Sequence, residues 1–374
     1  MPHILRRMST YIYQQQDWPN FTWEYERLSV ILGAVRNLQG KLMGKMEVFG
    51  FSLREEALLE TLTLDVLKST EIEGVILPSD QVRSSIARHL GMDVAGLDPS
   101  DRYVEGVVQM TLDATQHAEQ PLTPARLFNW QAALFPTGRS GIYKITVGDW
   151  RKDESEPMQV VSGAYGKERV HYQAPAAVDL DKEMKAFLDW FNTAETLDPV
   201  IKAGIAHVWF VIVHPFDDGN GRIARAIADM QLARADGSKQ RFYSMSAQIR
   251  HEQKAYYNIL EKTQKGGLDV TEWLHWFLYC LNNALSATDI TLSKVLFKAK
   301  FWESNRSVIM NERQRLMINK LLEGFEGKLT SSKWAIINKC SADTALRDMT
   351  DLISKGILRK EAAGGRSTGY ELNG

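Results

Sequence analysis

Residues 214–225, HPFDDGNGRIAR, bring a histidine, a carboxylate, a glycine-rich turn and two arginines together in one short segment. His214 ends an apolar run and is therefore placed to take a proton from an incoming nucleophile. Gly219 and Gly221 allow backbone N–H groups to converge, and the helix expected to begin near Arg222 adds its unpaired N-terminal N–H groups and the positive end of its dipole. The segment therefore predicts an anion-binding cradle beside a general base.

The charged residues of this segment suit a phosphorylated ligand. Arg222 and Arg225 stand three residues apart, so they share one face of the first helical turn and can each contact phosphate oxygens through two N–H groups. Asp218 offers a hard oxygen ligand for a Mg²⁺ ion that already bridges phosphates. A base, a metal-binding carboxylate, an anion cradle and arginines together indicate phosphoryl or nucleotidyl transfer, in which positioning and charge neutralisation supply most of the catalysis.

The segment HPFDDGNGRIAR is similar to the signature of the Fic family, H-x-F-x-[D/E]-G-N-G-R-x-x-R, and it meets every fixed position. The resemblance implies a mostly helical core that transfers AMP from ATP to a hydroxyl group of a target protein. It also implies that His214 is the general base, that Asp218 is the Mg²⁺ ligand and that Phe216 anchors the loop in the core. The remaining signature residues would hold the nucleotide: Gly219, Asn220 and Gly221 the α- and β-phosphates, and Arg222 and Arg225 the triphosphate tail. In the related branch that phosphorylates its targets a lysine stands at the position of Gly221, so the glycine favours AMP transfer.

Two further segments resemble parts of the same family. YGKERVHYQAP, residues 165–175, occupies the place of a hairpin flap that pairs with the backbone of the target segment and brings its hydroxyl near the base. IRHEQKAYYNIL, residues 249–260, resembles the segment that lines the adenine site, with Tyr256 or Tyr257 as the contact. We assign this contact to Tyr257, although two tyrosines on a helix are also typical of a core.

A second motif lies upstream of the signature. STEIEG, residues 69–74, is similar to the inhibitory motif [S/T]-x-x-x-E-[G/N] of the family, which Ser69, Glu73 and Gly74 match. In the family this glutamate pairs with the second arginine of the signature, here Arg225, and blocks the productive pose of the γ-phosphate. A carboxylate can replace a phosphate at a guanidinium because both accept two parallel hydrogen bonds. The resemblance therefore predicts an enzyme that Glu73 inhibits.

The composition is typical of a folded protein outside membranes. The chain has 374 residues, 44% of them hydrophobic, and a net charge of −1, which is ordinary for a packed protein of two or three domains. The longest strongly apolar stretch is too short to cross a bilayer, and MPHILRRMST lacks the apolar core of a signal peptide. We therefore expect a soluble cytoplasmic protein without a membrane partner. Cys280 and Cys340 are expected in different helices, which indicates neither a disulfide framework nor a cysteine metal site.

The pattern of apolar residues predicts that helices position this site. The expected helices lie at residues 23–46, 52–74, 79–90, 101–117, 123–134, 178–192 and 199–213. Ser52 and Glu55 should form a capping box for the second of these helices, and Asp198 should cap the last. Two short strands around residues 157–175 predict a β-hairpin. A helix with an aromatic stripe at 266–285 and a polar linker helix at about 288–305 are expected to follow.

Residues 290–374 differ from the rest of the chain in charge. They carry 15 Lys and Arg and 9 Asp and Glu, a net charge of +6, so the remainder carries −7. Three predicted helices, at 311–325, 331–340 and 341–356, precede two strands around Gly364 and Gly365, an order that resembles a winged helix. Its DNA contacts would be Arg347, Arg359, Lys360 and Arg366. Negative charge on the third helix would repel a duplex, so DNA and a partner protein both stay open as ligands; this charge comes from Asp343, Asp348 and Asp351.

These observations predict a mainly α protein with a small β-hairpin flap and a C-terminal winged-helix domain. Residues 1–100 would form a helical region that carries the inhibitory helix at about 53–74, residues 101–288 the catalytic core, and residues 289–374 a linker helix and the winged helix. The expected activity is AMP transfer from ATP, with Mg²⁺, to a Ser, Thr or Tyr hydroxyl of a target protein and of the chain itself. Two alternatives are a DNA-binding regulator whose core senses nucleotide and an enzyme that also removes AMP. The target, the type of modified residue and the oligomeric state, with a homodimer among the alternatives, stay open.

Overall fold

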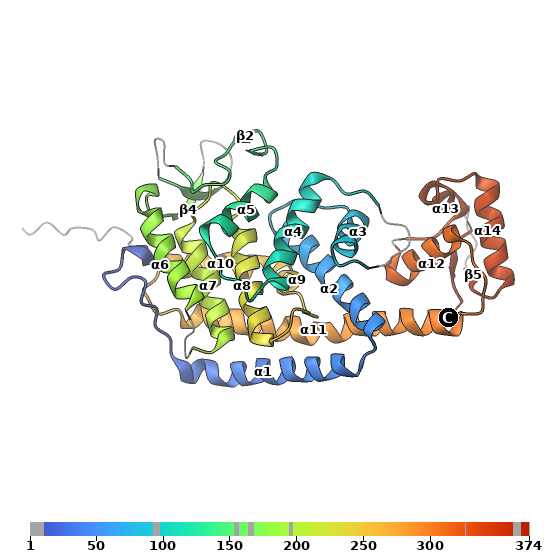
Figure 1. Cartoon of the computed structure of the whole chain (residues 1–374), viewed down its shortest axis with the longest axis horizontal. Coiled ribbons are helices and arrows are strands. Elements are labelled where there is room, and N and C mark those ends of the chain that lie inside the picture. Colours follow the sequence, from blue (N-terminus) through green and yellow to red (C-terminus); the bar gives the residue numbers. More distant parts are fainter. Residues whose placement is uncertain are drawn as a thin grey trace, which may run out of the picture. The chain divides into compact units, whose positions relative to one another are not determined.

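The computed structural model describes residues 11–92, 98–152, 157–163, 168–193, 197–325, 327–361 and 368–373. These residues form two compact units, of which the first ends at Thr288 and the second begins at Asp289. Helices dominate both units (Figure 1), which confirms the predicted mainly α class. Within the described ranges no helix is long and apolar enough to cross a membrane.

The first unit is built from helices and a few short strands. Its helices are α1 (Tyr25–Val48), α2 (Phe51–Ile72), α3 (Ser79–His89), α4 (Arg102–Gln116), α5 (Pro124–Leu134), α6 (Leu180–Asn192), α7 (Pro199–Val213), α8 (Asn220–Asp236), α9 (Met245–His251), α10 (Gln253–Gln264) and the beginning of α11 (Thr271–Ser304). Two short 3-10 helices, η1 (Ile12–Gln14) and η2 (Ala177–Asp179), precede α1 and α6. The strands form two antiparallel pairs, β1 (Arg139–Ser140) with β2 (Tyr143–Lys144) and β3 (Gln159–Ser162) with β4 (Arg169–Gln173).

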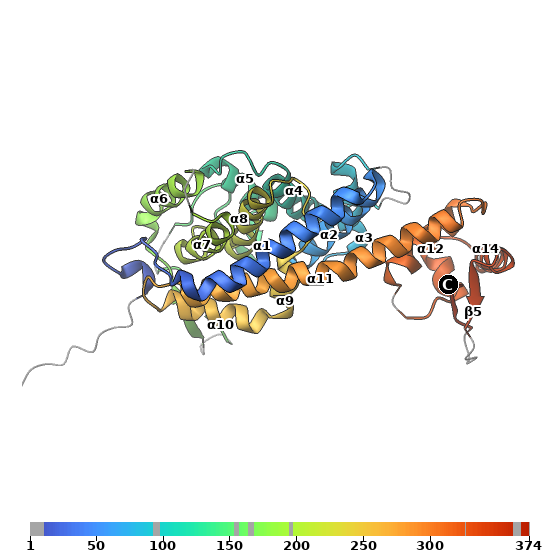
Figure 2. The ribbon, with the colours of Figure 1, turned by 90° about the horizontal axis from the view of Figure 1, so that it is seen from below.

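Helices α7 and α8 lie side by side in the interior of the first unit (Figures 1 and 2). All residues of α7 from Val200 to Val213 are buried, which explains why its sequence is apolar almost throughout. Asp198 caps α7 as predicted, because its carboxylate accepts hydrogen bonds from the backbone N–H groups of Val200 and Ile201. The loop between α7 and α8 is therefore held between two buried helices.

Helix α2 ends as predicted but begins differently. The capping box predicted at Ser52 is wrong, because α2 already begins at Phe51 with Gly50 in the N-cap position and no side-chain cap. Gly50 has extended backbone angles, φ −61° and ψ 162°, so the chain enters the helix before the serine. At the other end Gly74 has a φ of +79°, and the backbone N–H of Val75 donates to the carbonyl of Thr70. This left-handed glycine ends the helix directly after Glu73.

The strands confirm one predicted hairpin and add a smaller one. Strands β3 and β4 pair across residues 159–173, with a bulge between Val160 and Val161. Residues 165–167 of the predicted flap lie outside the described residues. The β1–β2 pair was not predicted, because two-residue strands leave no alternating pattern to recognise.

Two expectations about helices in the second half of the chain are wrong. The predicted division into an aromatic helix and a separate polar linker helix is wrong, since α11 is one continuous helix of 34 residues. No glycine or proline interrupts the segment where its composition changes, so the backbone has no reason to stop. Cys280 is buried in α11, but Cys340 follows α13 (Ser331–Ile337) and does not lie in a helix as expected.

The second unit has three helices followed by two strands, in the predicted order. They are α12 (Glu312–Gly324), α13, α14 (Ala342–Ser354), β5 (Leu358–Lys360) and β6 (Tyr370–Leu372). Side chains of Asn311, Thr330 and Ser341 cap the three helices. The core includes Trp334 and Met349, both fully buried. Gly364, Gly365 and Arg366 lie outside the described residues.

Candidate active site

His214 occupies the point where α7 stops. Its backbone angles are φ 51° and ψ 57°, a left-handed conformation that is uncommon for a residue with a side chain. The apolar helix can therefore end abruptly, and the imidazole is placed at the start of the loop that leads to α8. Such an outlier at a predicted catalytic residue suggests that the surrounding contacts enforce the geometry.

The imidazole of His214 is held in the form that a general base requires. Its Nδ1 lies 3.3 Å from the carbonyl oxygen of Val211. Because that oxygen can only accept a hydrogen bond, Nδ1 carries the proton and Nε2 is left with a free lone pair. Burial lowers the pKa of His214 to about 4. The ring is therefore neutral at physiological pH, with Nε2 able to accept a proton.

Arg151 fixes the backbone around His214 and was missed in the sequence. Its Nε donates to the carbonyl of His214 at 2.8 Å, and its own backbone N–H donates to the carbonyl of Pro215 at 2.9 Å. Its Nη2 donates to the carbonyl of Pro175, which follows strand β4. One nearly buried guanidinium thus joins the histidine turn to the end of the hairpin. Nothing local in GDWRK distinguishes this arginine from a surface residue.

The loop after His214 is braced from within. Asn220 accepts a hydrogen bond from the backbone N–H of Phe216 at 3.0 Å and donates to its carbonyl at 2.7 Å. Phe216 is fully buried, as the resemblance implied, and its ring lies 5.3 Å from that of Trp150. The Asn220 side chain therefore shapes the loop, and any contact it makes with phosphate would come from its backbone. Gly219 has a φ of +91°, and an added Cβ would lie 3.0 Å from the ring of Phe135, so only glycine fits there.

Asp218 is the exposed carboxylate of the loop. Its side chain is 43% exposed and lies 3.7 Å from Nη2 of Arg222. Its Oδ1 accepts from the backbone N–H of Gly219 at 2.5 Å, and its Oδ2 accepts from the hydroxyl of Ser140, a residue of β1 that sequence reasoning missed. Within the described residues no group of three or more His, Cys, Asp or Glu side chains could hold a metal ion alone. A single accessible carboxylate suits Mg²⁺, which takes one or two carboxylates and completes its shell with phosphate and water oxygens.

Arg222 is held between the beginning of α4 and the end of α5. Its side chain is 5% exposed, its Nη1 donates to the hydroxyl of Tyr103 at 2.6 Å, and its guanidinium lies 5.0 Å from the ring centre of Phe135. Tyr103 lies in the first turn of α4 and Phe135 follows the last residue of α5, so these two aromatic residues set the direction of the arginine.

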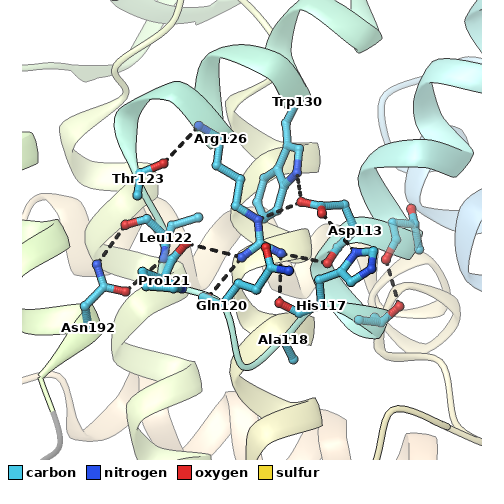
Figure 3. A network of polar contacts seen from close by, with 12 residues as sticks. Asp113, His117, Ala118, Gln120, Pro121, Leu122, Thr123, Arg126, Trp130 and Asn192 are labelled. Atoms are coloured by element: carbon cyan, nitrogen blue, oxygen red, sulfur yellow. Dashed lines mark hydrogen bonds and ion pairs between the residues drawn. The ribbon is translucent and has the colours of Figure 1, made fainter.

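The turn that joins α4 to α5, at the other end of these two helices, is held by a polar network around Arg126, shown in Figure 3. Nε of Arg126 donates to the carboxylate of Asp113 at 2.6 Å, and Nε1 of Trp130 donates to the same carboxylate at 2.7 Å. The guanidinium also donates to backbone carbonyls at the end of α4 and in the turn that follows, those of Asp113, His117, Gln120 and Pro121. The network therefore fixes the beginning of α5 against the end of α4.

Arg225 contacts the upstream motif at residues 69–74, as the resemblance implied. Its Nη2 donates to Oε1 of Glu73 at 2.7 Å and to the backbone carbonyl of Ser69 at 2.9 Å, and its Nε donates to the Ser69 hydroxyl at 3.0 Å. Arg225 is 2% exposed, whereas the Glu73 side chain is 31% exposed. A Cβ added to Gly221 would lie 2.5 Å from Oε1 of Glu73. The glycine thus leaves room for the glutamate above the start of α8.

The two tyrosines of α10 have different roles. Tyr256 is 1% exposed, and its hydroxyl lies 2.9 Å from Nε2 of the buried His207. Tyr257 is 44% exposed, and its hydroxyl donates to the carbonyl of Ile72 at the end of α2. Tyr257 is therefore the tyrosine that a ligand can reach, whereas Tyr256 packs in the core.

The β3–β4 hairpin is anchored to α10 by charge. His171 lies 2.7 Å from Oε2 of Glu261, and Arg169 donates to Oε1 of the same carboxylate at 2.9 Å. Hydrogen bonds from Lys265 and His171 lower the pKa of Glu261 to about 2, so the anchor keeps its negative charge at neutral pH. The hydroxyl of Tyr172 donates to the carbonyl of Ile212, which ties β4 to the helix that ends at His214.

Comparisons with known proteins find matches for two parts of the chain. Residues 121–232 match the model of the Fic/DOC family, and residues 11–92 match a domain of unknown function, DUF4172. The chain is 34% identical over 115 residues to protein adenylyltransferase Fic of Nematostella vectensis, a match that covers 30% of this chain and 25% of that protein. It is 45% identical over 56 residues to protein adenylyltransferase fic-1 of Caenorhabditis elegans, covering 14% of this chain and 11% of that protein. The chain thus spans a quarter or less of these relatives.

A solved structure has the same fold over nearly the whole chain. The crystal structure of a Fic family protein from Desulfovibrio desulfuricans G20 superimposes with a TM-score of 0.52. The superposition covers 93% of this chain and 96% of that one, at 19% sequence identity. At this identity the likeness concerns the fold alone.

Proposed function

We propose that this chain, which contains a Fic/DOC family domain at residues 121–232, transfers AMP from ATP to a hydroxyl group of a target protein. The observation that carries the proposal is the combination of a neutral His214 with two buried arginines one turn apart at the start of α8. A free imidazole lone pair suits removal of the hydroxyl proton, and the arginines suit the charge of a triphosphate. The acceptor would be a Ser, Thr or Tyr side chain of the target or of the chain itself.

The residues of the loop take separate roles in this proposal. Nε2 of His214 accepts the proton of the attacking hydroxyl, which makes the oxygen a better nucleophile toward the α-phosphorus. As the new oxygen–phosphorus bond forms, the bond from the α-phosphorus to the oxygen that bridges to the β-phosphate breaks, and pyrophosphate leaves. Backbone N–H groups around Gly219 and Gly221 would bind phosphate oxygens at the N-terminus of α8. Asp218 would hold a Mg²⁺ ion, which supplies charge neutralisation of the phosphates when it is bound. Arg222 and Arg225 orient the triphosphate, and Tyr257 would contact the adenine.

Glu73 is the residue through which we propose that the enzyme is inhibited. It occupies a hydrogen-bonding position on the Arg225 guanidinium that a phosphate would need. Ser69 accepts two more hydrogen bonds from the same guanidinium, so Arg225 is committed to α2. The same glutamate could instead orient a water that removes AMP from a modified target. Both directions use the site described above, and they differ in whether loss of Glu73 stops the removal.

The proposal is tested with labelled nucleotide. The full chain is incubated with a cell lysate and ATP labelled at the α-phosphate, and a parallel sample receives ATP labelled at the γ-phosphate. We expect protein-bound label from the first and none above background from the second, because the transferred group is AMP. Label from the γ-phosphate would indicate phosphorylation and contradict the proposal. The absence of label with both nucleotides, also for Glu73→Gly, would contradict an enzymatic role.

A second candidate function, binding of duplex DNA by the C-terminal residues 289–374, is supported by the pairing of acidic residues on α14. Asp348 is 6% exposed, and both of its carboxylate oxygens accept hydrogen bonds from Arg313. Asp351 accepts from Lys355 at 2.6 Å. The repulsion expected from these two residues is therefore largely neutralised within the unit. Asp343, at the beginning of α14, remains exposed.

The basic residues expected at a DNA interface are not equally available. Arg347 on α14 is exposed, and its Nε donates to the backbone carbonyl of Asp343 at a long distance of 3.4 Å. Lys360 on β5 is also exposed. Arg359 is engaged with the carboxylate of Glu371 at 2.9 Å. Arg347 and Lys360 are thus the better candidates for phosphate contacts.

We expect binding of a mixed duplex to weaken steeply with salt, because bound phosphates release counterions. The double substitution Arg347→Ala with Lys360→Ala should reduce the slope of log affinity against log salt by about 2, one phosphate contact for each residue. Arg315→Ala, which removes an exposed charge from α12, is the matched control and should change the slope less. A fluorescence anisotropy titration at several salt concentrations measures these slopes. Absence of binding at low salt would favour a protein partner for this unit.

A further inference from the structure

Helix α2 presents a stripe of three polar residues to α8. Asp65, Ser69 and Glu73 follow one another at intervals of four residues and therefore lie on one face of α2. Ser69 and Glu73 contact Arg225, while Asp65 lies against Asp229, one turn further along α8. The contact between the two helices thus has two parts, an inhibitory part at Arg225 and a second part at Asp229.

The second part is a buried cluster with an unusual charge balance. Asp65 is 6% exposed, and Asp229 and Arg241 are each 4% exposed. Nη1 of Arg241 pairs with Oδ1 of Asp229 at 2.6 Å. The Asp65 carboxylate accepts from the hydroxyl of Ser244 at 2.5 Å and from the backbone N–H of Ser246 at 3.3 Å. Arg241 is thus bonded to Asp229, while Asp65 and Asp236 act on the same guanidinium through their charge.

Two further charged groups, Asp236 and Arg36, lie near this cluster. Asp236, also on α8, accepts hydrogen bonds from the Tyr243 hydroxyl and from Gln39 of α1. Arg241 acts on Asp236 as well, and so does Arg36 of α1, which pairs with Asp198. The charged groups that act on Asp229 are therefore Asp65, which disfavours its ionisation, and Arg241, which favours it.

Binding of one proton removes a buried negative charge from the cluster. With both carboxylates ionised, one uncompensated negative charge would be buried between two helices, which is costly. With one proton bound, Asp65 and Asp229 together carry one negative charge, and Arg241 lies beside it. Burial, together with the adjacent Asp65, raises the pKa of Asp229 to about 7 in spite of Arg241. The cluster therefore exchanges this proton close to physiological pH.

We propose that one proton held between Asp65 and Asp229 keeps the inhibitory helix α2 against α8, and that loss of this proton releases Glu73 from Arg225. This regulation rests on the proposed function, since it acts through the same inhibitory contact. When the proton leaves, the two carboxylates repel each other directly across the α2–α8 contact. Separation of α2 from α8 relieves the repulsion and also moves Ser69 and Glu73 away from Arg225. AMP transfer would therefore increase as the pH rises through neutrality.

The direction and the size of this effect follow from proton linkage. The pKa of Asp229 is raised in the closed state, so the closed state binds the proton more tightly than an open state in which Asp229 reaches water. Opening then releases one proton and becomes more favourable as the pH rises. If opening returns the pKa of Asp229 to about 3.9, its ordinary value, the ratio of open to closed enzyme rises about tenfold between pH 6 and pH 8.

The proposal is tested with a ratio of two rates, in which the pH dependence of the chemical step itself cancels. Initial rates of automodification are measured between pH 6 and pH 8 for the wild type and for Glu73→Gly, and the ratio of wild type to variant is plotted. We expect this ratio to rise about tenfold, because Glu73→Gly has no inhibitory contact to release. In an Asp229→Asn background the ratio should stay flat, since the neutral amide would leave Asp65 and Arg241 balanced at every pH. An equal rise in the Asp229→Asn background would overturn the proposal.

Two further variants serve as controls, one for misfolding of Asp229→Asn and one for titration of a different carboxylate. Asp65→Asn leaves the Asp229–Arg241 pair intact and should also give a flat ratio, so it replaces Asp229→Asn if that variant does not fold. Asp236→Asn removes a nearby buried carboxylate that pairs with Tyr243, and it should keep the rise. A flat ratio in the Asp236→Asn variant alone would show that the proposal assigns the proton to the wrong carboxylate.

Hydrogen exchange separates this proposal from the function on which it rests. Amide exchange in the last turn of α2, corrected for the intrinsic effect of pH on exchange, should increase from pH 6 to pH 8 in the wild type and not in Asp229→Asn. If no variant transfers AMP, the proposed function fails, while the exchange result still decides whether the proton holds α2. Exchange that is independent of pH in the wild type would overturn the proton-held contact even in an active enzyme.

Discussion

Replacing His214 with alanine is expected to reduce AMP transfer by roughly 10²- to 10⁴-fold, the usual contribution of a general base. The substitution removes the Nε2 lone pair that the Val211 contact leaves free, so the hydroxyl must attack without losing its proton to the enzyme. ATP affinity should change little, because the phosphates are held by α8 and its arginines. Single-turnover rates with α-labelled ATP, together with nucleotide titrations, separate the two effects. A folded variant with unchanged transfer would remove His214 from the mechanism.

The pH dependence of the reaction provides a second test of the same residue. The pKa of His214 is lowered to about 4 by burial, so the base stays neutral well below the ordinary histidine pKa of about 6.5. The rate should therefore fall on the acid side near pH 4 and not near 6.5, as the imidazole becomes protonated. The measurement belongs in the Glu73→Gly background, where release of the inhibitory helix does not contribute. An acid limb near 6.5 would mean that the imidazole is solvated in the reacting complex.

The sequence could predict the local parts of the site because their causes are local. The signature loop, the Asp198 cap of α7 and the glycine that ends α2 each depend on residues a few positions apart. Their geometry follows from helix capping and from the left-handed preference of glycine. The pairing of Glu73 with Arg225 joins distant segments, and the resemblance supplied it where spacing alone could not.

The parts that were missed depend on tertiary contacts. Arg151 acts on His214 and Pro175 through backbone carbonyls, which leave no complementary residue in the sequence. Ser140 reaches Asp218 from a two-residue strand that has no recognisable pattern. The sequence does not distinguish Asp348 from the other acidic residues on the third helix of the second unit. The structure shows that its carboxylate accepts a hydrogen bond from Arg313. Periodicity assigns residues to a face, but it does not say which charge meets which partner.

Replacing Glu73 with glycine is expected to raise AMP transfer about tenfold or more, including transfer to the chain itself. The hydrogen bond between Glu73 and Arg225 joins two charged groups, one of them buried, and such a bond contributes roughly 1.5 to 3 kcal/mol. Its loss shifts the population of Arg225 that can bind a phosphate by a corresponding factor. Glu73→Gln is the matched control, because its amide oxygen can still accept from Arg225 without the charge. It should give an intermediate rate.

The origin of the gain is established by removing the partner as well. Arg225→Ala added to Glu73→Gly should abolish the increase, because the guanidinium that was released is no longer there to hold the triphosphate. A gain that persisted in the double variant would mean that Glu73 blocks the space above Gly221 and does not compete for Arg225. A Cβ added to Gly221 would lie 2.5 Å from the Glu73 carboxylate, so the two residues are close enough for such a steric block. Removal of AMP separates the two enzymatic directions: when Glu73 orients a water, Glu73→Gly also stops the loss of AMP from a modified target. When Glu73 only inhibits, the rate of that loss is the same in both forms.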